Sequence, residues 1–179
     1  MFYVIWSVVI AFCVVADQIS KFFVVQNIAL ESGRVTVIPG VLEFIYTQNP
    51  GAAFGSMQDE NSRWIFMSLS TVAILGILIY LFWKRPKSKL LCASLALIVG
   101  GGIGNMIDRF ALKYVVDFIN FIAFPKIWYF PFNIADSFVV VGSFMLIGWM
   151  IIDTVKEFKA EKQKKLESAS EGTENSENE

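Results

Sequence analysis

The feature that most constrains the fold is a run of twenty residues without a charge, residues 64–83, with a tryptophan at each end. At 1.5 Å per residue, a helix of this length is about 30 Å long, which is the thickness of the hydrocarbon core of a bilayer. Tryptophan is enriched where such a helix meets the two membrane surfaces. The run therefore predicts a membrane-spanning helix.

Three further apolar segments complete a predicted four-helix membrane domain over residues 1–152. The expected spans are residues 2–25, 64–83, 90–107 and 134–152, joined on the outer side by loops at 26–63 and 108–133. The first segment is longer than the apolar core of a cleaved signal peptide and has no basic residue before it, so we expect it to remain as a helix. The predicted fold class is an all-α membrane protein.

Charged residues are concentrated outside these spans. Residues 1–152 hold eight acidic and ten basic residues, whereas the short segment 153–179 alone holds eight acidic and five basic ones. A body so poor in charge is not typical of a water-soluble domain, and its nearly neutral balance argues against a nucleic-acid partner. The polar, glutamate-rich segment 153–179 predicts a disordered cytoplasmic tail.

Basic residues orient the predicted bundle. One group lies in the short connection after the second span and another follows the fourth span: Lys84, Arg85, Lys87 and Lys89, and Lys156, Lys159, Lys162, Lys164 and Lys165. By the positive-inside rule both groups are cytoplasmic. We therefore expect a multi-pass protein with both termini in the cytoplasm and both long loops on the outer face.

The first outer loop has a pattern of its own. Residues 35–46 are rich in strand-forming side chains and are interrupted by Pro39 and Gly40, which predicts a short hairpin against the membrane surface. The sequence Asn49, Pro50, Gly51 then predicts a turn.

The chain contains no histidine, and its two cysteines have no metal-binding or redox spacing. Mechanisms that require a catalytic histidine or a histidine-ligated metal are therefore excluded. We expect neither a metal nor a cofactor. Catalysis, if present, has to come mainly from acidic, lysine, serine or tyrosine side chains.

Acids near membrane depth are the candidates, because each ionisable group there costs about 2.5 kcal/mol or more. Asp17 and Lys21 are four residues apart, so one helical face can pair them. Asp108 is followed by Arg109, a candidate partner for it. Pairing of this kind favours structural or positioning roles for these residues.

Asp117 and Asp136 favour a catalytic role. Asp117 lies in an outer loop among apolar residues that disfavour its charged form, and Asp136 lies in the first turn of the fourth span, so both are expected at the outer surface. Two carboxylates that share a site tend to share one proton. The ionised member then activates water and the protonated member polarises a carbonyl, which is the chemistry of aspartic proteases.

Two other functions stay open on these grounds. A proton- or ion-translocating protein could use the same acids as a relay, although the second and fourth spans carry no ionisable group near their centres. A structural assembly protein would not need the acids at all.

Five short sequence blocks resemble those of one family and occur in the same order. They are D-Q-I-S-K at 17–21, N-P-G-A-A-F-G at 49–55, G-N-M-I-D-R at 104–109, V-D-F at 116–118 and F-N-I-A-D-S at 132–137. Over about residues 10–152 the chain resembles the bacterial lipoprotein signal peptidases (signal peptidase II), which are four-span membrane aspartyl peptidases.

The resemblance implies a set of roles. Asp117 and Asp136 would form the catalytic pair, and the residues that shape the site or contact substrate would be Asp17, Lys21, Asn49, Gly51, Asn105, Asp108, Arg109 and Asn133. The implied fold adds a small outer β-cradle and a short outer helix to the four spans.

The implied substrate is a prolipoprotein with a diacylglyceryl group on a cysteine, cut just before that cysteine. The enzyme would act as a monomer among membrane lipids, with its site at the extracytoplasmic face of the bacterial inner (cytoplasmic) membrane.

Overall fold

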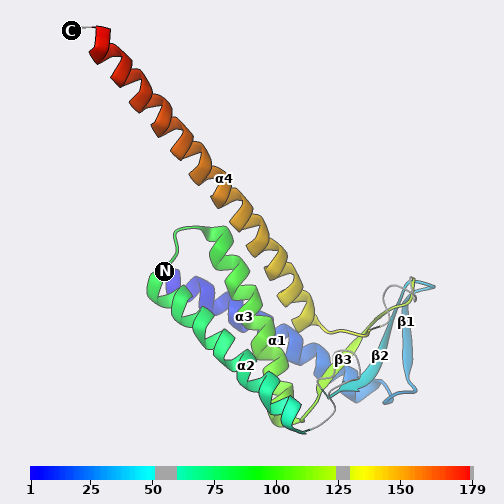
Figure 1. Ribbon diagram of the computed structural model, residues 1–179. Helices are drawn as coiled ribbons and strands as arrows, with labels where there is room; N and C mark the ends of the chain where they lie inside the picture. Colours follow the sequence, from blue (N-terminus) through cyan, green and yellow to red (C-terminus); the bar gives the residue numbers. More distant parts are fainter. Residues whose placement is uncertain (51–59, 124–129, 178–179) are drawn as a thin grey trace.

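The computed structural model describes residues 1–50, 60–123 and 130–177. Its helices are α1 (Phe2–Asn27), α2 (Glu60–Ile79), which continues as a π-helical turn η2 (Tyr80–Lys84), α3 (Lys89–Ala111) and α4 (Ile134–Glu177) (Figure 1). Each of the four is long and apolar enough to cross a membrane. The prediction of four spans is confirmed.

Helix α3 lies at the centre of the bundle and contacts the other three helices. Small residues permit this close packing, as they commonly do between membrane helices. A methyl group on Gly100 would lie 2.5 Å from the Cβ atom of Cys13, and one on Gly104 would lie 2.6 Å from a carboxylate oxygen of Asp17. These glycines therefore allow α1 and α3 to approach each other at the level of the polar residues.

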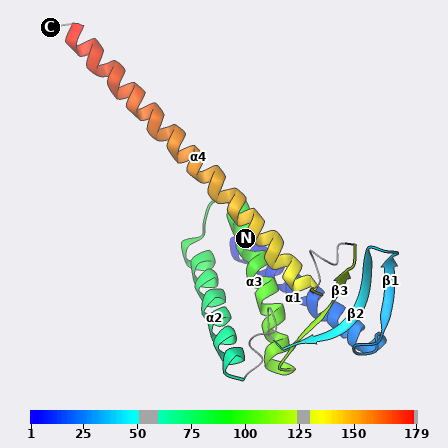
Figure 2. The ribbon, with the colours of Figure 1, turned by 45° about the vertical axis from the view of Figure 1, so that its right-hand side comes forward.

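A three-stranded antiparallel sheet lies at one end of the bundle (Figure 2). Its strands are β1 (Arg34–Ile38), β2 (Leu42–Asn49) and β3 (Val115–Phe121). The hairpin β1–β2 is confirmed, and Gly40 supplies the positive φ of 72° in its turn. Strand β3 was not predicted, because its residues were assigned to an outer loop.

The sheet is fixed to the end of α1 by a small apolar core. Its members come from α1 and its end, β2 and β3: Val24, Ile28, Tyr46, Val116 and Phe118. Burial of side chains of this size stabilises the contact by about 1.5–3 kcal/mol each. The sheet therefore holds β3 in a fixed position beside α1, which places Asp117 next to the membrane helices.

The structure differs from the predicted boundaries at two helix ends. Helix α3 continues to Ala111, so Asp108 and Arg109 belong to its last turn and not to the outer loop. Helix α4 continues without a break to Glu177, where the composition predicted a disordered tail. Lysine, glutamate, alanine and glutamine favour helix there, and no proline interrupts it.

The remaining fold prediction concerns the short outer helix. No such element is formed by the residues that the structure describes, and residues 51–59 lie outside them.

Candidate active site

Four elements meet at the sheet end of the bundle: α1, the last turns of α3, β3 and the first turn of α4. Polar side chains from all four converge there. The buried ones are Asp17, Lys21, Asn105, Asp108, Asp117 and Asn133. Within the described part of the chain, every buried side-chain nitrogen and oxygen has a hydrogen-bond partner. A polar cluster this fully satisfied is a rigid site.

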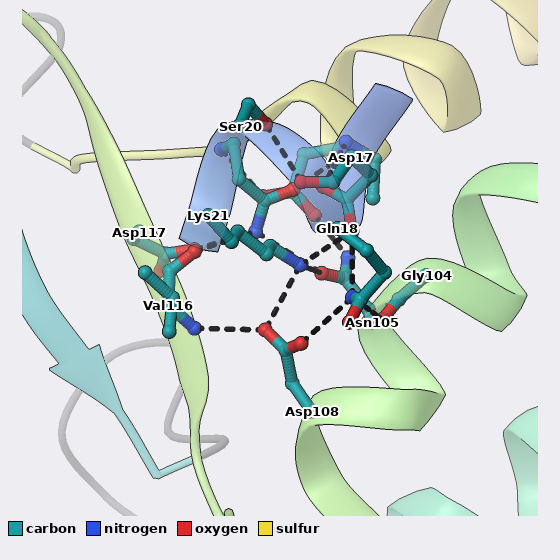
Figure 3. A network of polar contacts seen from close by, with 12 residues as sticks. Asp17, Gln18, Ser20, Lys21, Gly104, Asn105, Asp108, Val116 and Asp117 are labelled. Atoms are coloured by element: carbon teal, nitrogen blue, oxygen red, sulfur yellow. Dashed lines mark hydrogen bonds and ion pairs between the residues drawn. The ribbon is translucent and has the colours of Figure 1, made fainter. Parts of the chain in front are cut away.

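Lys21 is the centre of the cluster (Figure 3). Its Nζ atom lies 2.8 Å from Asp17 Oδ2 and 2.9 Å from Asp108 Oδ2, and it donates to Asn105 Oδ1 at 3.0 Å. The predicted pair of Asp17 and Lys21 is present. The suggested partner of Asp108 was wrong, because Lys21 occupies that place and Arg109 instead donates to the backbone oxygen of Asn105 at 3.4 Å.

Gln18 is a member of the cluster that the sequence analysis did not single out. Its Nε2 atom lies 3.2 Å from Asp17 Oδ2, 2.9 Å from Asp108 Oδ1 and 3.1 Å from the backbone oxygen of Gly104. It therefore links α1 to α3 beside the lysine. The only feature of the sequence that pointed to Gln18 was its position in the D-Q-I-S-K block at 17–21.

Lys21 fixes the orientation of the Asn105 amide. A lysine ammonium only donates hydrogen bonds, so the oxygen of Asn105 has to face it. The Nδ2 group of Asn105 then points the other way and donates to Asp136 Oδ1 at 2.7 Å. The buried lysine therefore helps to set which atom of Asn105 is presented to Asp136, together with a second donor to the same oxygen, the Asn133 amide.

Asn133 and Asp136 form a reciprocal cap at the start of α4. The backbone N–H of Asn133 donates to Asp136 Oδ2 at 3.1 Å, and the backbone N–H of Asp136 donates to Asn133 Oδ1 at 2.9 Å. This is the arrangement of a capping box, with Asn and Asp in place of Ser or Thr and Glu. These two hydrogen bonds hold both side chains against the first turn of α4.

The same cap aims the Asn133 amide at the second carboxylate. With its oxygen held by Asp136, its Nδ2 group donates to Asp117 Oδ1 at 2.7 Å and to Asn105 Oδ1 at 3.0 Å. Asn133 thus bridges Asp117 and Asp136. The two acids that the sequence analysis selected are brought together by one asparagine.

Asp117 lies on β3, where it faces Thr47 of β2 in the antiparallel register. Asn49, at the end of β2, donates to Asp117 Oδ2 at 2.9 Å. The pKa of Asp117 is raised to about 7, mainly by burial. The hydrogen bond from Asn49 lowers this pKa, whereas the charge of Asp136 raises it. At neutral pH this carboxyl group can therefore hold a proton.

Two predicted site residues remain, Arg109 and Gly51. Arg109 is half-buried on α3, within electrostatic reach of Asp108, Asp117 and Asp136. Gly51 lies outside the described residues. Within the described ranges, no group of three or more histidine, cysteine or acidic side chains could hold a metal ion.

A four-span helical bundle with two carboxylates bridged at one end defines a membrane protein with a candidate aspartyl site. Residues 9–152 match the family model described as Signal peptidase (SPase) II, and the chain therefore belongs to the signal peptidase II family. It is a peptidase of the membrane, as the resemblance implied. The ion-translocating alternative finds no support in this membership.

Individual relatives agree with the family model. The chain is 41% identical to the lipoprotein signal peptidase of Symbiobacterium thermophilum over 148 residues, which cover 82% of this chain and 94% of that one. It is also 41% identical to that of Caldanaerobacter subterraneus subsp. tengcongensis over 145 residues, covering 81% and 94%. A solved bacterial membrane enzyme matches with a TM-score of 0.77 and 25% identity, covering 86% of this chain and 92% of that one.

Proposed function

We propose that the chain removes signal peptides from prolipoproteins that carry a diacylglyceryl group, and that it cuts just before the lipidated cysteine. The observation that carries this proposal is the bridge from Asn133 to both Asp117 and Asp136. In a chain of this family, two acids held at one site form the catalytic pair. Asp17, Lys21, Asn49, Asn105, Asp108, Arg109 and Asn133 position them, and Gly51 is proposed to contact the substrate.

The two acids divide the work according to their surroundings. Asp136 stands in the first turn of α4, where a helix N-terminus favours negative charge, so we assign the ionised form to it. Asp117 is buried and holds the proton. Asp136 takes a proton from water, whose oxygen attacks the peptide carbonyl carbon, while Asp117 gives its proton to the carbonyl oxygen.

Collapse of the resulting tetrahedral intermediate completes the reaction. The proton held by Asp136 passes to the leaving nitrogen as the C–N bond breaks, and a proton of the gem-diol returns to Asp117. Both carboxyl groups then regain their starting states. The amides of Asn105 and Asn133 supply hydrogen bonds to the pair without adding charge.

An apolar groove beside the site suits a lipid-modified substrate. It has a volume of about 560 Å³, lies between α2 and α3, and is lined by Thr71, Ile74, Leu75, Ile103, Met106, Ile107, Phe110 and Ala111. Met106 directly follows the site residue Asn105. We propose that the diacylglyceryl chains enter this groove while the peptide lies against the sheet.

We also propose the orientation and state of the protein in the cell. The basic connection between η2 and α3 lies at the bundle end opposite the sheet (Figure 1). The positive-inside rule then gives cytoplasmic termini and an active site at the outer face of the bacterial inner membrane. One chain contains all the proposed site residues, so a monomer is sufficient.

The function is tested by incubating the purified full-length protein with a diacylglyceryl-modified precursor and, in parallel, with the unmodified precursor. We expect cleavage of the modified form alone, with a new N-terminus at the lipidated cysteine, measured by mass spectrometry. Equal cleavage of both precursors would remove the lipid requirement. If neither precursor is cleaved, the proposed function is overturned.

The proposed proton on Asp117 predicts a pH dependence. Because the pKa of this carboxyl group is about 7, its proton is lost as the pH rises through that value, and the general acid is lost with it. We expect kcat/KM for the lipidated precursor to fall about tenfold per pH unit above about pH 7. A profile that stays level to about pH 9 would contradict the assignment.

A further inference from the structure

A second pocket lies at the end of the bundle away from the sheet. It has a volume of about 590 Å³ and is formed by the first turns of α1 and by the connection from η2 into α3. Figure 1 shows the start of α1 beside this connection. Trp6, in its wall, is fifteen residues before Lys21 on α1, or about 22 Å along the helix. The pocket is therefore separate from the candidate active site.

Three exposed basic side chains line this pocket: Arg85, Lys87 and Lys89. The sequence offers no neutralising acid nearby, since neither residues 1–16 nor residues 61–107 contain aspartate or glutamate. Among the residues that the structure describes, no carboxylate lies within 4.0 Å of these three cations. The pocket therefore presents uncompensated positive charge.

The basic connection is held in a defined conformation. The guanidinium carbon of Arg85 lies 4.6 Å from the centre of the Tyr3 ring, which itself stacks on Phe82 at 5.8 Å. This contact orients Arg85 without neutralising it. The Cys92 thiol donates to the backbone oxygen of Pro86 at 3.2 Å. A binding partner thus meets an Arg85 side chain that is already positioned, which lowers the entropy cost of binding.

The remaining wall of the pocket is apolar. Phe2, Ile5 and Trp6 of α1 form it, on a helix apolar enough to lie in the bilayer. The first turn of α3 begins at Lys89, so its helix dipole adds positive potential at the polar side. A ligand that satisfies both sides carries an anionic head and an apolar body.

We propose that this pocket binds an anionic phospholipid. Its phosphate group is held by Arg85, Lys87 and Lys89, and its acyl chains lie against Phe2, Ile5 and Trp6. Basic pockets between membrane helices at the headgroup level are suited to such lipids. A free phosphate ion would satisfy the cations but leave the apolar wall uncovered, so we assign the site to the lipid.

The test measures lipid affinity of the full-length protein in detergent by native mass spectrometry. The probes are phosphatidylglycerol, phosphatidylcholine with the same acyl chains, and inorganic phosphate. The pocket variant combines Arg85→Gln, Lys87→Gln and Lys89→Gln. We expect the unmodified protein to prefer phosphatidylglycerol, and the pocket variant to bind it about a hundredfold more weakly.

A matched variant separates this pocket from general attraction to a basic surface. Lys156→Gln, Lys159→Gln and Lys162→Gln remove the same amount of charge from the exposed face of α4. We expect that variant to keep its affinity, and both variants to cleave precursor at the normal rate in lipid-free detergent. Equal loss in the two variants, no preference over phosphatidylcholine, or displacement of the lipid by millimolar inorganic phosphate would each overturn the proposal.

Discussion

Replacing Asp117 or Asp136 with asparagine is expected to lower kcat for the lipidated precursor by about 10³-fold or more. Each substitution removes one half of a proton-transfer pair, and such a group contributes about 10²–10⁴-fold to rate. Because the two groups act as one unit, the double variant should be hardly worse than either single variant. The measurement is single-turnover cleavage by the purified protein.

Glu43→Gln is the matched control for these two variants. Glu43 is also a buried acid, but it lies on the sheet, where Arg34 and Asn120 bind it. We expect its turnover to stay within a few-fold of normal, and all three variants to keep the helical circular dichroism of the parent. Near-normal turnover in both aspartate variants, or an equal loss in Glu43→Gln, would show that the pair is not catalytic.

The membrane bundle was predictable because one strong physical effect dominates it. The cost of charge in hydrocarbon forces long uncharged segments, and the confirmed four spans follow directly from that requirement. The hairpin β1–β2 was predictable from its strand formers and from the turn at Gly40. Both signals are local, so a single sequence contains them.

Strand β3 was missed because its pairing is not local. Its residues pair with β2 across more than sixty positions of sequence, so nothing adjacent in the chain marks them as a strand. The partner of Asp108 was assigned wrongly for the same reason. Arg109 is its neighbour in sequence, but a helix turns consecutive residues to different sides, and Lys21 reaches Asp108 from α1.

The acids themselves were easier to select than their surroundings. Asp117 and Asp136 were chosen from their apolar setting and their expected depth, and the structure brings both to Asn133. The amide chain that connects them to Lys21 could not be read from the sequence. It depends on which atoms of Asn105 and Asn133 face each other, and that follows only from the packed helices.

Lys21 provides the second large expected effect. Lys21→Met should destabilise the protein by about 3–5 kcal/mol, because it leaves the carboxylates of Asp17 and Asp108 buried without a cation. The ion pair between Arg34, which is exposed, and Glu43, which also accepts a hydrogen bond from Asn120, supplies the control. Arg34 is 63% exposed, so Arg34→Met should cost less than about 1 kcal/mol. Chemical denaturation in detergent micelles measures both free energies of unfolding.

Lys21→Met should also reduce catalysis for a reason separate from stability. Without the lysine, the Asn105 oxygen keeps only the hydrogen bond from Asn133, so the amide is held less firmly and its donation to Asp136 is weakened. We expect kcat to fall about tenfold or more at temperatures where the variant is folded, with KM little changed, because a donor to the reacting pair is weakened. Adding Asp17→Asn to Lys21→Met should recover part of the stability, since it removes one of the two unpaired charges, but it should not recover kcat. Recovery of both together would mean that Lys21 acts on catalysis only through the fold.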